Sequence, residues 1–388
     1  MKFFLIAGEP SGDRLGAALI NGFGKLLSSP PVLVGIGGSH MIDTGFKSLF
    51  PMKEISIMGM SEIVSKYFFL KKRIAQTAQA VIEAQPDVLI TIDLPEFNLR
   101  VANIVRKKSD IPIIHYVAPT VWAWRPRRAE KMAKSVDHVL ALLPFEPKYM
   151  TKAGISCHFV GHPVADEPIA TLDEAAAFRA SYNLGEEPLV LCLPGSRISE
   201  VNRLAPIFGK AVSNLKSSSP ELRFVMPAAP AIAAEVRDLI SEWQEEVIFL
   251  DPRYQTPDEA LSQKRAAFRA ANVALAASGT VSLELAASET PMVIGYDMGF
   301  FSRQIIGHLV KTDTVTLVNL VSDTRHVPEF IGSDCTPDNL SRSVLQVLNS
   351  PEGQLQAMEE TMILLGKGEK SPGERAAASV LGIISAKP

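Results

Sequence analysis

The sequence lacks a membrane-spanning run, a basic net charge and a recognisable cysteine pattern. Its longest uncharged stretch, near residues 273–283, is interrupted by Ser, Gly and Thr, whereas a spanning helix needs about 20 apolar residues. The formal net charge of -3 argues against non-specific binding of nucleic acid. The three cysteines have neither an even count nor metal-ligand spacing, so we expect reduced thiols, no metal and a cytoplasmic setting. These absences predict a globular protein that is soluble or peripheral to a membrane.

Short apolar runs and segments of helical periodicity alternate along the chain. The runs lie at residues 3–8, 31–38, 87–93, 111–119, 138–146, 188–196, 223–229, 246–252, 273–280 and 291–298. Strands that are apolar on both faces, each followed by a helix, are typical of parallel α/β sheets. A chain of 388 residues is long for one core. The pattern also starts again at Leu189, so we predict two doubly wound domains, at residues 1–168 and 169–350, with helices at 351–388.

Two turns in the second half carry groups that bind anions. The motif LPGSR places Gly195, Ser196 and Arg197 after an apolar run, so that backbone N–H groups and a guanidinium can converge on one phosphate. The motif SGT, residues 278–280, opens another predicted helix, and Glu284 follows where it can accept hydrogen bonds from a ribose. Each motif alone is also consistent with an ordinary capped turn and a solvated side chain. Together they favour a diphosphate site.

Carboxylates occupy the comparable positions of the first half. Asp93 ends the apolar run DVLITI and can act as a general base, because partial burial raises a carboxyl pKa; the alternative is that it caps the next helix. The first turn, AGEPSGD, carries Glu9 and Asp13, and carboxylates repel phosphate. This turn is therefore predicted to hold a different ligand from the turns of the second half.

Two segments combine aromatic and basic residues. Residues 116–134 contain two tryptophans and a cluster of five cations, namely Trp122, Trp124, Arg125, Arg127, Arg128, Lys131 and Lys134. Residues 59–73 form an apolar helical stripe that ends in Tyr67, Phe68, Phe69, Leu70, Lys71, Lys72 and Arg73. Both patterns are typical of a membrane interface or of a large anionic, partly apolar ligand. A buried core beside a solvated basic face is the alternative for each.

The order and spacing of eight motifs resemble those of lipid-A-disaccharide synthase, a family of inverting glycosyltransferases with two Rossmann-like domains and a cleft between them (the GT-B architecture). The motifs are AGEPSGD (7–13), MGMSEI (58–63), IDLPEFN (92–98), VWAWRPRR (121–128), LPFE (143–146), FVGHPVAD (159–166), LPGSRISEV (193–201) and SGTVSLELA (278–286). Two positions depart from the family: Val318 replaces a proline, and Gly332 replaces a glutamine. The resemblance covers nearly the whole chain.

The resemblance implies a reaction and a division of residues between two substrates. UDP-2,3-diacylglucosamine and 2,3-diacylglucosamine 1-phosphate would be joined into a β-1,6-linked disaccharide with release of UDP, without a metal or other cofactor. Asp93 would be the catalytic base, and Arg197 would stabilise the departing UDP. The implied UDP site comprises Gly195, Ser196, Arg197, Ser278, Gly279, Thr280, Glu284 and Asn319. The implied acceptor side comprises Glu9, Ser11, Gly12, Asp13, Asn98, Trp124, Arg125 and Arg128.

The resemblance further implies a place in the cell and partners other than nucleic acid. The enzyme would be cytoplasmic and peripheral on the inner face of the inner membrane, in contact with membrane lipids. Its last helices would return to the first domain or be exchanged in a homodimer. Two other functions fit the same nucleotide loops: a soluble UDP-sugar epimerase, and a non-catalytic UDP-sugar-binding or membrane-adaptor protein in which Asp93 only caps a helix.

Overall fold

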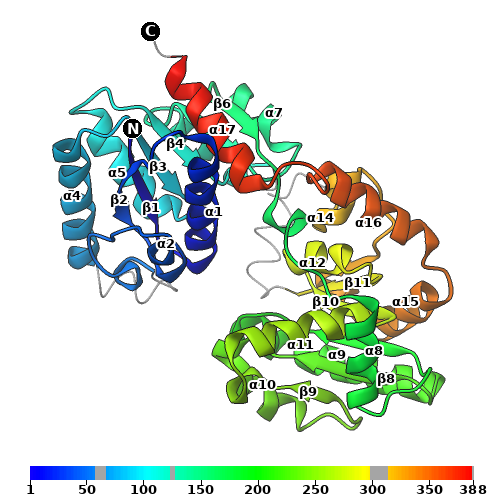
Figure 1. The fold of residues 1–388 in the computed structure, drawn as a ribbon. Helices are drawn as coiled ribbons and strands as arrows, with labels where there is room; N and C mark the ends of the chain where they lie inside the picture. The colour runs from blue at the N-terminus through cyan, green and yellow to red at the C-terminus, as the bar shows by residue number, and fades with distance from the viewer. Residues whose placement is uncertain (57–66, 123–126, 298–312, 387–388) are drawn as a thin grey trace. The chain divides into compact units, whose positions relative to one another are not determined.

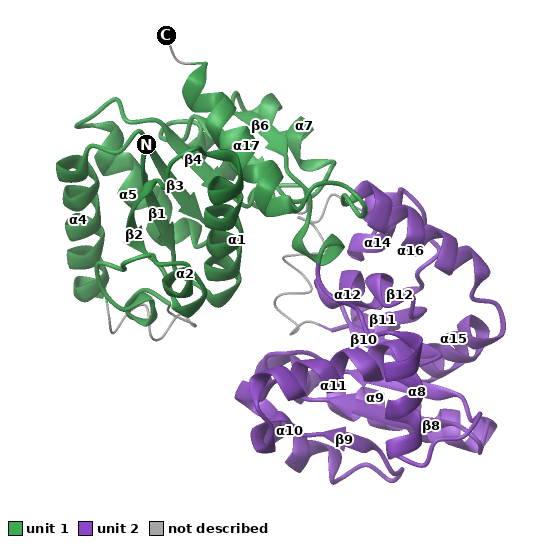
Figure 2. Ribbon diagram, in the orientation of Figure 1, with its two compact units in different colours: residues 1–166, 365–388 green, residues 167–364 purple. Residues whose placement is uncertain are grey.

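The computed structural model describes residues 1–56, 67–122, 127–297 and 313–386, which form two compact units (Figures 1 and 2). Unit 1 comprises residues 1–166 and 365–388, and unit 2 comprises residues 167–364. Within the described residues, each unit is built around its own parallel sheet with helices between the strands. The predicted α/β class with two doubly wound domains is confirmed.

The sheet of unit 1 has the strand order β2-β1-β3-β4-β5-β6, and every described pair is parallel. Its strands are β1 (Lys2–Ala7), β2 (Val32–Ile36), β3 (Val88–Ile92), β4 (Ile113–Tyr116), β5 (His138–Ala141) and β6 (Ser156–Phe159). The order of strands reverses between β1 and β3. In such sheets, ligands bind beyond the carboxyl ends of the strands at this switch point. The turns after Ala7 and Ile92 are therefore the expected ligand position of unit 1.

Side chains of the unit 1 strands are buried on both faces, which explains their uninterrupted apolar character. Phe3 and Leu5 face one helical layer, whereas Phe4 and Ile6 face the other. The first layer contains α1 (Pro10–Leu26), α2 (Ser39–Asp43) and α17 (Pro372–Ser385). The second contains α4 (Tyr67–Ala84), α5 (Pro95–Arg106), α6 (Arg127–Met132) and α7 (Glu146–Lys152).

The last helix, α17, packs against α1 in unit 1 (Figure 2). Gly22 and Gly373 permit this contact, because a Cβ on Gly22 would lie 2.5 Å from the Gly373 carbonyl oxygen. The helix starts where the sequence predicts, with the Ser371 hydroxyl accepting a 3.3 Å hydrogen bond from the Glu374 N–H. The predicted segment 351–388 is divided, since α16 (Glu352–Leu364) packs on helices of unit 2.

The sheet of unit 2 has the strand order β12-β11-β10-β7-β8-β9, and its described pairs are also parallel. Its strands are β7 (Leu189–Leu193), β8 (Arg223–Pro227), β9 (Ile248–Leu250), β10 (Val273–Ala277), β11 (Met292–Tyr296) and β12 (Glu329–Ile331). Here the order reverses between β7 and β10. The motifs LPGSR and SGT directly follow these two strands, so both predicted phosphate turns lie at one switch point.

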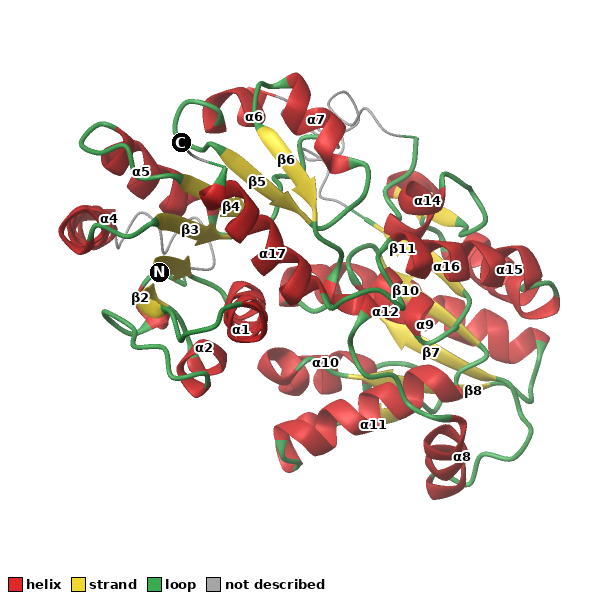
Figure 3. Ribbon diagram, turned by 45° about the horizontal axis from the view of Figure 1, so that its top comes forward, coloured by secondary structure: helices red, strands yellow, loops and turns green. Residues whose placement is uncertain are grey.

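Helices cover both faces of this second sheet (Figure 3). They are α8 (Leu172–Ser181), α9 (Ile198–Ser218), α10 (Ala233–Ile240), α11 (Pro257–Ala270), α12 (Val281–Ala287), α14 (Leu317–Ser322), α15 (Pro337–Asn349) and α16. Among the described residues of the two units, single 3-10 turns follow the strands β6, β8, β9 and β12, at η2 (Pro163–Ala165), η3 (Pro230–Ile232), η4 (Pro252–Tyr254) and η5 (Gly332–Asp334), and another, η1 (Met52–Glu54), follows α2. Val190, Phe208 and Phe224 are among the fully or almost fully buried residues of the α9 face.

Candidate active site

The turns after β1 and β3 of unit 1 contact one another closely. Gly8 faces Leu94, and a Cβ on Gly8 would lie 2.2 Å from a methyl carbon of that leucine. The Ser11 hydroxyl, from the first turn of α1, donates a hydrogen bond to the Asp93 carboxylate. The switch point therefore joins Ser11 and Asp93, two residues of the predicted acceptor side.

Asp93 is held in an unusual backbone conformation. Both Asp93 and Leu94 have positive φ, at 51° and 42° respectively. Each non-glycine residue in this left-handed region raises the free energy of the folded state by about 1–3 kcal/mol. Strain of this kind is common at functional sites. Asn98 offsets part of this cost: it is fully buried, and its amide donates hydrogen bonds to the carbonyls of Ile92 (3.2 Å) and Asp93 (2.7 Å).

Asp93 lies one residue before the N-cap position of α5. The N-cap residue of α5 is Leu94, so Asp93 does not cap that helix. Burial raises the pKa of Asp93, while hydrogen bonds from the Leu94 N–H and the Ser11 hydroxyl act in the opposite direction. Asp93 is thus a half-buried carboxylate with a raised pKa at the end of the central strand β3.

Asp13, predicted to contact the acceptor, has its carboxylate hydrogen-bonded within the protein. It is 1% exposed, and its carboxylate accepts hydrogen bonds from the N–H groups of Gly38 (2.7 Å), His40 (2.9 Å) and Met41 (3.2 Å). These groups belong to the start of α2, which the carboxylate caps. We therefore correct the prediction for Asp13, whereas Glu9 lies half-buried at the N-cap of α1 and Gly12 packs against Ile92.

The aromatic and basic segment at 116–134 is only partly described. Trp124 and Arg125 lie outside the described residues. Trp122 is buried and packs edge-to-face on Phe145, with ring centroids 5.3 Å apart, so it belongs to the core. The guanidinium of Arg128 lies 2.9 Å from the Glu96 carboxylate of α5, which places this cation beside the helix that follows Asp93.

Residues 67–73 form the start of α4 and contain an exposed aromatic group. Phe68 is 84% exposed, Tyr67 46% and Phe69 40%, and Lys71 and Lys72 are also exposed. The remainder of the predicted stripe, 59–66, lies outside the described residues.

Arg73 differs from these neighbours and corrects the prediction that it faces a membrane. Its guanidinium is paired with Glu54 and lies over the rings of Phe50 and Phe69, at 4.3 and 5.1 Å. These contacts hold the start of α4 against the rest of unit 1.

The LPGSR turn of unit 2 lies at the start of α9. Gly195 has a φ of +131°, and Arg197 is the N-cap residue of the helix. The Arg197 side chain is 75% exposed, and its guanidinium lies 3.2 Å from the Glu200 carboxylate. Ser196 is also exposed. The turn thus presents a guanidinium and backbone N–H groups to solvent beyond the central strand β7.

The SGT turn at the end of β10 is more open. Gly279 and Thr280 are exposed, and no atom lies within 4 Å of the place where a Gly279 Cβ would stand. The next helix, α12, has Thr280 at its N-cap without a side-chain capping bond. Glu284, the predicted ribose contact, forms an ion pair with Lys264 of α11. The protein groups that were predicted to bind phosphate therefore lie at the ends of two adjacent strands, β7 and β10.

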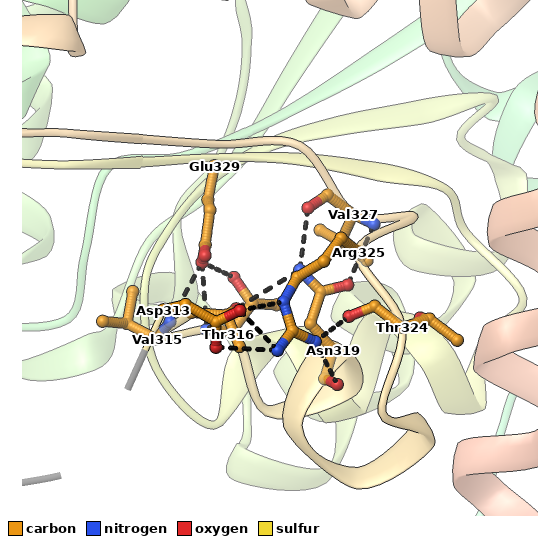
Figure 4. A network of polar contacts seen from close by, with 9 residues as sticks. Asp313, Val315, Thr316, Asn319, Thr324, Arg325, Val327 and Glu329 are labelled. Atoms are coloured by element: carbon orange, nitrogen blue, oxygen red, sulfur yellow. Dashed lines mark hydrogen bonds and ion pairs between the residues drawn. The ribbon is translucent and has the colours of Figure 1, made fainter. Parts of the chain in front are cut away.

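Asn319 lies in a polar network that uses its side chain internally (Figure 4). The residue is 1% exposed; its amide donates to the Val327 carbonyl at 2.9 Å and accepts from the Val327 N–H at 3.0 Å. The nearby Glu329 carboxylate accepts hydrogen bonds from the N–H groups of Val315 and Thr316, both at 3.1 Å. We therefore correct the prediction that Asn319 binds UDP directly: it fixes the chain that precedes β12.

Two glutamates were missed because the motifs that contain them were assigned to other residues. Glu200 lies within LPGSRISEV and contacts both Ser196 and Arg197. Glu146, the last residue of LPFE, is 3% exposed and accepts hydrogen bonds from the N–H groups of Leu142 and Leu143. Burial raises the pKa of Glu146 to about 7. A glutamate one turn after an anion-binding glycine was a signal that could have pointed to Glu200.

Among the described residues, no group of three or more His, Cys, Asp and Glu side chains could hold a metal ion. In the same part of the chain, no helix is both long and apolar enough to span a membrane.

Comparisons with known proteins agree along the entire chain. The family model described as Lipid-A-disaccharide synthetase matches residues 3–380. A lipid-A-disaccharide synthase from Ruegeria pomeroyi is 54% identical over 382 residues, covering 98% of this chain and 95% of the relative. A second, from Rhodospirillum centenum, is 41% identical over 390 residues, covering 99% of this chain and 95% of the relative.

Solved structures show the same fold at low sequence identity. A UDP-GlcNAc 2-epimerase from Neisseria meningitidis, bound to UDP-GlcNAc, has a TM-score of 0.65 and 14% identity over 99% of this chain and 100% of its own. A glycosyltransferase from Rickettsia africae has a TM-score of 0.60 and 11% identity over 100% and 99%. The two parallel sheets and these neighbours confirm the predicted fold with two Rossmann-like domains. With the family model and the close relatives, the resemblance first seen in the motifs is confirmed: the chain belongs to the lipid-A-disaccharide synthase family.

Proposed function

We propose that the protein transfers the 2,3-diacylglucosaminyl group of UDP-2,3-diacylglucosamine to the 6-hydroxyl of 2,3-diacylglucosamine 1-phosphate. The products are a β-1,6-linked disaccharide 1-phosphate and UDP. One observation carries the proposal in structural terms: the two switch points hold complementary groups, a carboxylate in unit 1 and anion-binding turns in unit 2. Family membership supplies the identity of the sugars.

Unit 2 binds UDP in this proposal. Backbone N–H groups of Gly195 and Ser196, the Arg197 guanidinium and the turn 278–280 would receive the diphosphate, which lies beyond β7 and β10. As the bond to the sugar breaks, negative charge builds up on the departing UDP. Arg197 then stabilises the transition state more than the ground state. Glu284 and its partner Lys264 would border the ribose.

Unit 1 activates the acceptor in this proposal. The Asp93 carboxylate accepts the proton of the 6-hydroxyl as that oxygen attacks the anomeric carbon of the donor sugar. Attack from the face opposite UDP inverts the configuration and gives the β linkage. Asn98 and the contact with Ser11 fix the position of the carboxylate. The raised pKa makes Asp93 a stronger base than a solvated aspartate.

A turnover assay tests the proposal. Purified protein is incubated with the UDP-diacyl sugar and the acylated sugar phosphate, and UDP and the disaccharide are both measured. We expect the two products in equal amounts, and none when the acceptor is left out. Release of UDP without disaccharide, or no turnover, would contradict the proposed transfer.

A UDP-sugar epimerase is the second candidate, because epimerases are among the structural neighbours. Such an enzyme needs only one substrate, so UDP-GlcNAc alone should be converted. We expect no conversion, since the two relatives described above, at 54% and 41% identity, are both named as synthases. Conversion of UDP-GlcNAc alone would favour the epimerase and remove the role of Asp93 as base for an acceptor.

Membrane association is a further part of the proposal. The exposed aromatic rings Tyr67, Phe68 and Phe69 lie beside the exposed Lys71 and Lys72 at the start of α4. This combination fits an apolar contact with acyl chains and an electrostatic contact with anionic headgroups. Both substrates carry acyl chains, so a peripheral enzyme on the cytoplasmic side of the inner membrane would meet them directly.

Vesicle binding tests this surface. Replacing Phe68, Phe69 and Leu70 with Ser should lower binding to anionic vesicles by about tenfold or more, because the buried apolar area is lost. UDP affinity should stay the same, since unit 2 is unchanged. Triple replacement of the exposed Leu172, Tyr254 and Ile363 of unit 2 with Ser is the control. Equal vesicle binding by the parent protein and the α4 variant would contradict the proposal.

A further inference from the structure

Glu200 has no role in the reaction as described so far, although it touches the proposed diphosphate site. It lies in the first turn of α9, three residues after the N-cap residue Arg197. One carboxylate oxygen, Oε1, is 3.2 Å from the Arg197 guanidinium, and Oε2 accepts a 3.4 Å hydrogen bond from the Ser196 N–H. The carboxylate therefore uses the same groups that the proposed function assigns to UDP.

Gly195 makes room for this carboxylate. Its φ of +131° favours glycine, and a Cβ at this position would lie 2.8 Å from the Glu200 Cβ and 2.9 Å from Oε2. A larger residue would displace Glu200 from the turn. The missing side chain of Gly195 therefore leaves space that either of two anions can occupy, a phosphate of the ligand or the Glu200 carboxylate.

Two other helices of unit 2 show how a glutamate at this position behaves when it only caps a helix. Glu174 of α8 and Glu259 of α11 each complete a capping box, in which they accept a hydrogen bond from the N-cap threonine N–H at 2.7 and 2.8 Å. In α9 the N-cap residue is Arg197, whose side chain can only donate. Glu200 bonds instead to Ser196, one residue further out. Its contacts are those of an anion bound to the turn.

We propose that Glu200 is a positioning residue that holds the empty UDP site in its binding geometry and competes with the diphosphate for it. Carboxylate and phosphate carry charge of the same sign, so both cannot contact Arg197 and the Ser196 N–H together. UDP binding displaces Glu200. When UDP leaves, Glu200 returns and neutralises Arg197, which favours release of the product. This inference rests on the proposed function, because it requires the diphosphate at this turn.

The variant E200Q tests the competition, because it removes the charge and keeps the size of the side chain. By calorimetry, we expect E200Q to bind UDP about 5- to 20-fold more tightly than the parent protein. Uridine, which has no phosphate, should bind both equally. In the turnover assay, KM for the UDP-sugar should fall, and kcat should fall with it because UDP leaves more slowly. E200D should restore part of the parent behaviour, and added salt should reduce the difference.

The variant E259Q is the matched control: it makes the same charge change at the same helical position of another helix in unit 2. It should leave UDP affinity unchanged. If E200Q binds UDP as the parent does, or more weakly, the competition is overturned, because Glu200 then only orients Arg197 or stabilises α9. If the parent protein itself does not bind UDP, the proposed nucleotide site fails and the inference falls with it. UDP binding by the parent thus distinguishes the two failures.

Discussion

The two switch points occupy the same topological position and differ in chemistry. In unit 1 the turns after β1 and β3 are closely packed through Gly8 and Leu94, and they present the Asp93 carboxylate on strained backbone. In unit 2 the turns after β7 and β10 are exposed, and they present N–H groups, hydroxyls and the Arg197 guanidinium. Parallel topology therefore places the turns of both units at equivalent positions, and the residues of the turns give each switch point its charge.

Two carboxyl groups away from the switch points have pKa values shifted in opposite directions, one in each unit. Glu146 of unit 1 is buried, and its pKa is raised to about 7. In unit 2, hydrogen bonding to Arg253 lowers the pKa of Asp251 to about 2, with help from the charge of Arg237. Ionisation of Glu146 therefore opposes folding of unit 1, whereas ionisation of Asp251 stabilises unit 2.

The largest effect is expected for D93N. The amide cannot accept the acceptor proton, so turnover should fall by about 100- to 10,000-fold, while UDP affinity stays within twofold of the parent. The control is D87N, which changes a carboxylate at the opposite end of the same strand, where Asp87 accepts a 2.7 Å hydrogen bond from the Lys2 N–H. Turnover of D93N within a few-fold of the parent would show that Asp93 is not the base.

A pH-dependent stability difference is expected for E146Q. Because the folded pKa of Glu146 is about 7 against an ordinary value of 4.5, its contribution is present below about pH 4.5 and is lost as pH rises through 7. The loss is on the order of 3 kcal/mol. Between pH 4 and 8.5, denaturant unfolding of the parent should show this loss, and E146Q should not. E83Q, at an exposed residue of α4, is the control; parallel pH profiles for parent and E146Q would contradict the prediction.

A nucleotide-affinity effect is expected for R197Q. Losing a charged hydrogen bond to the diphosphate should weaken UDP binding by about 10- to 50-fold, measured by calorimetry. R253Q is the control, because Arg253 follows β9 at the same end of the sheet but pairs with Asp251 away from the switch point. If R253Q loses as much UDP affinity as R197Q, UDP binding depends on positive charge along the whole edge of the sheet. The switch point of unit 2 would then have no special role in binding UDP.

The smallest effect is expected for S11A. The Ser11 hydroxyl lowers the pKa of Asp93, so its removal should raise that pKa further and move the acidic limb of the pH–rate profile to higher pH. Turnover near neutral pH should change by about two- to tenfold. An unchanged acidic limb in S11A, together with a normal melting temperature, would mean that Ser11 does not act on Asp93.

The sequence was sufficient to predict the central strands and the turns that follow them. All ten predicted apolar runs contain strands. Both faces of each sheet are covered by helices, so residues such as Leu5, Leu89 and Leu191 are fully buried and the strand sequences are apolar throughout. The strands β6 and β12 were missed. Each lies at the edge of its sheet and is at most partly buried, and β12 has only three residues, so neither leaves a continuous apolar run.

Individual side-chain roles were harder to predict because they depend on distant partners. Asp13 accepts hydrogen bonds from the N–H groups of residues 38, 40 and 41, Arg73 pairs with Glu54, and Asn319 bonds to Val327. Nothing in the local motifs indicates these contacts. The left-handed backbone at Asp93 and Leu94, which places Leu94 at the N-cap of α5, is likewise not revealed by propensity or periodicity.

The central claim is that UDP binds at the switch point of unit 2 while the switch point of unit 1 serves the acceptor. Hydrogen–deuterium exchange of the full-length protein with and without saturating UDP tests it most directly, because the N–H groups of the turns are the proposed ligands. The account predicts protection of residues 195–200 and 279–284, with unchanged exchange at residues 8–13 and 93–98. Protection of the unit 1 turns without protection of residues 195–200 would contradict it.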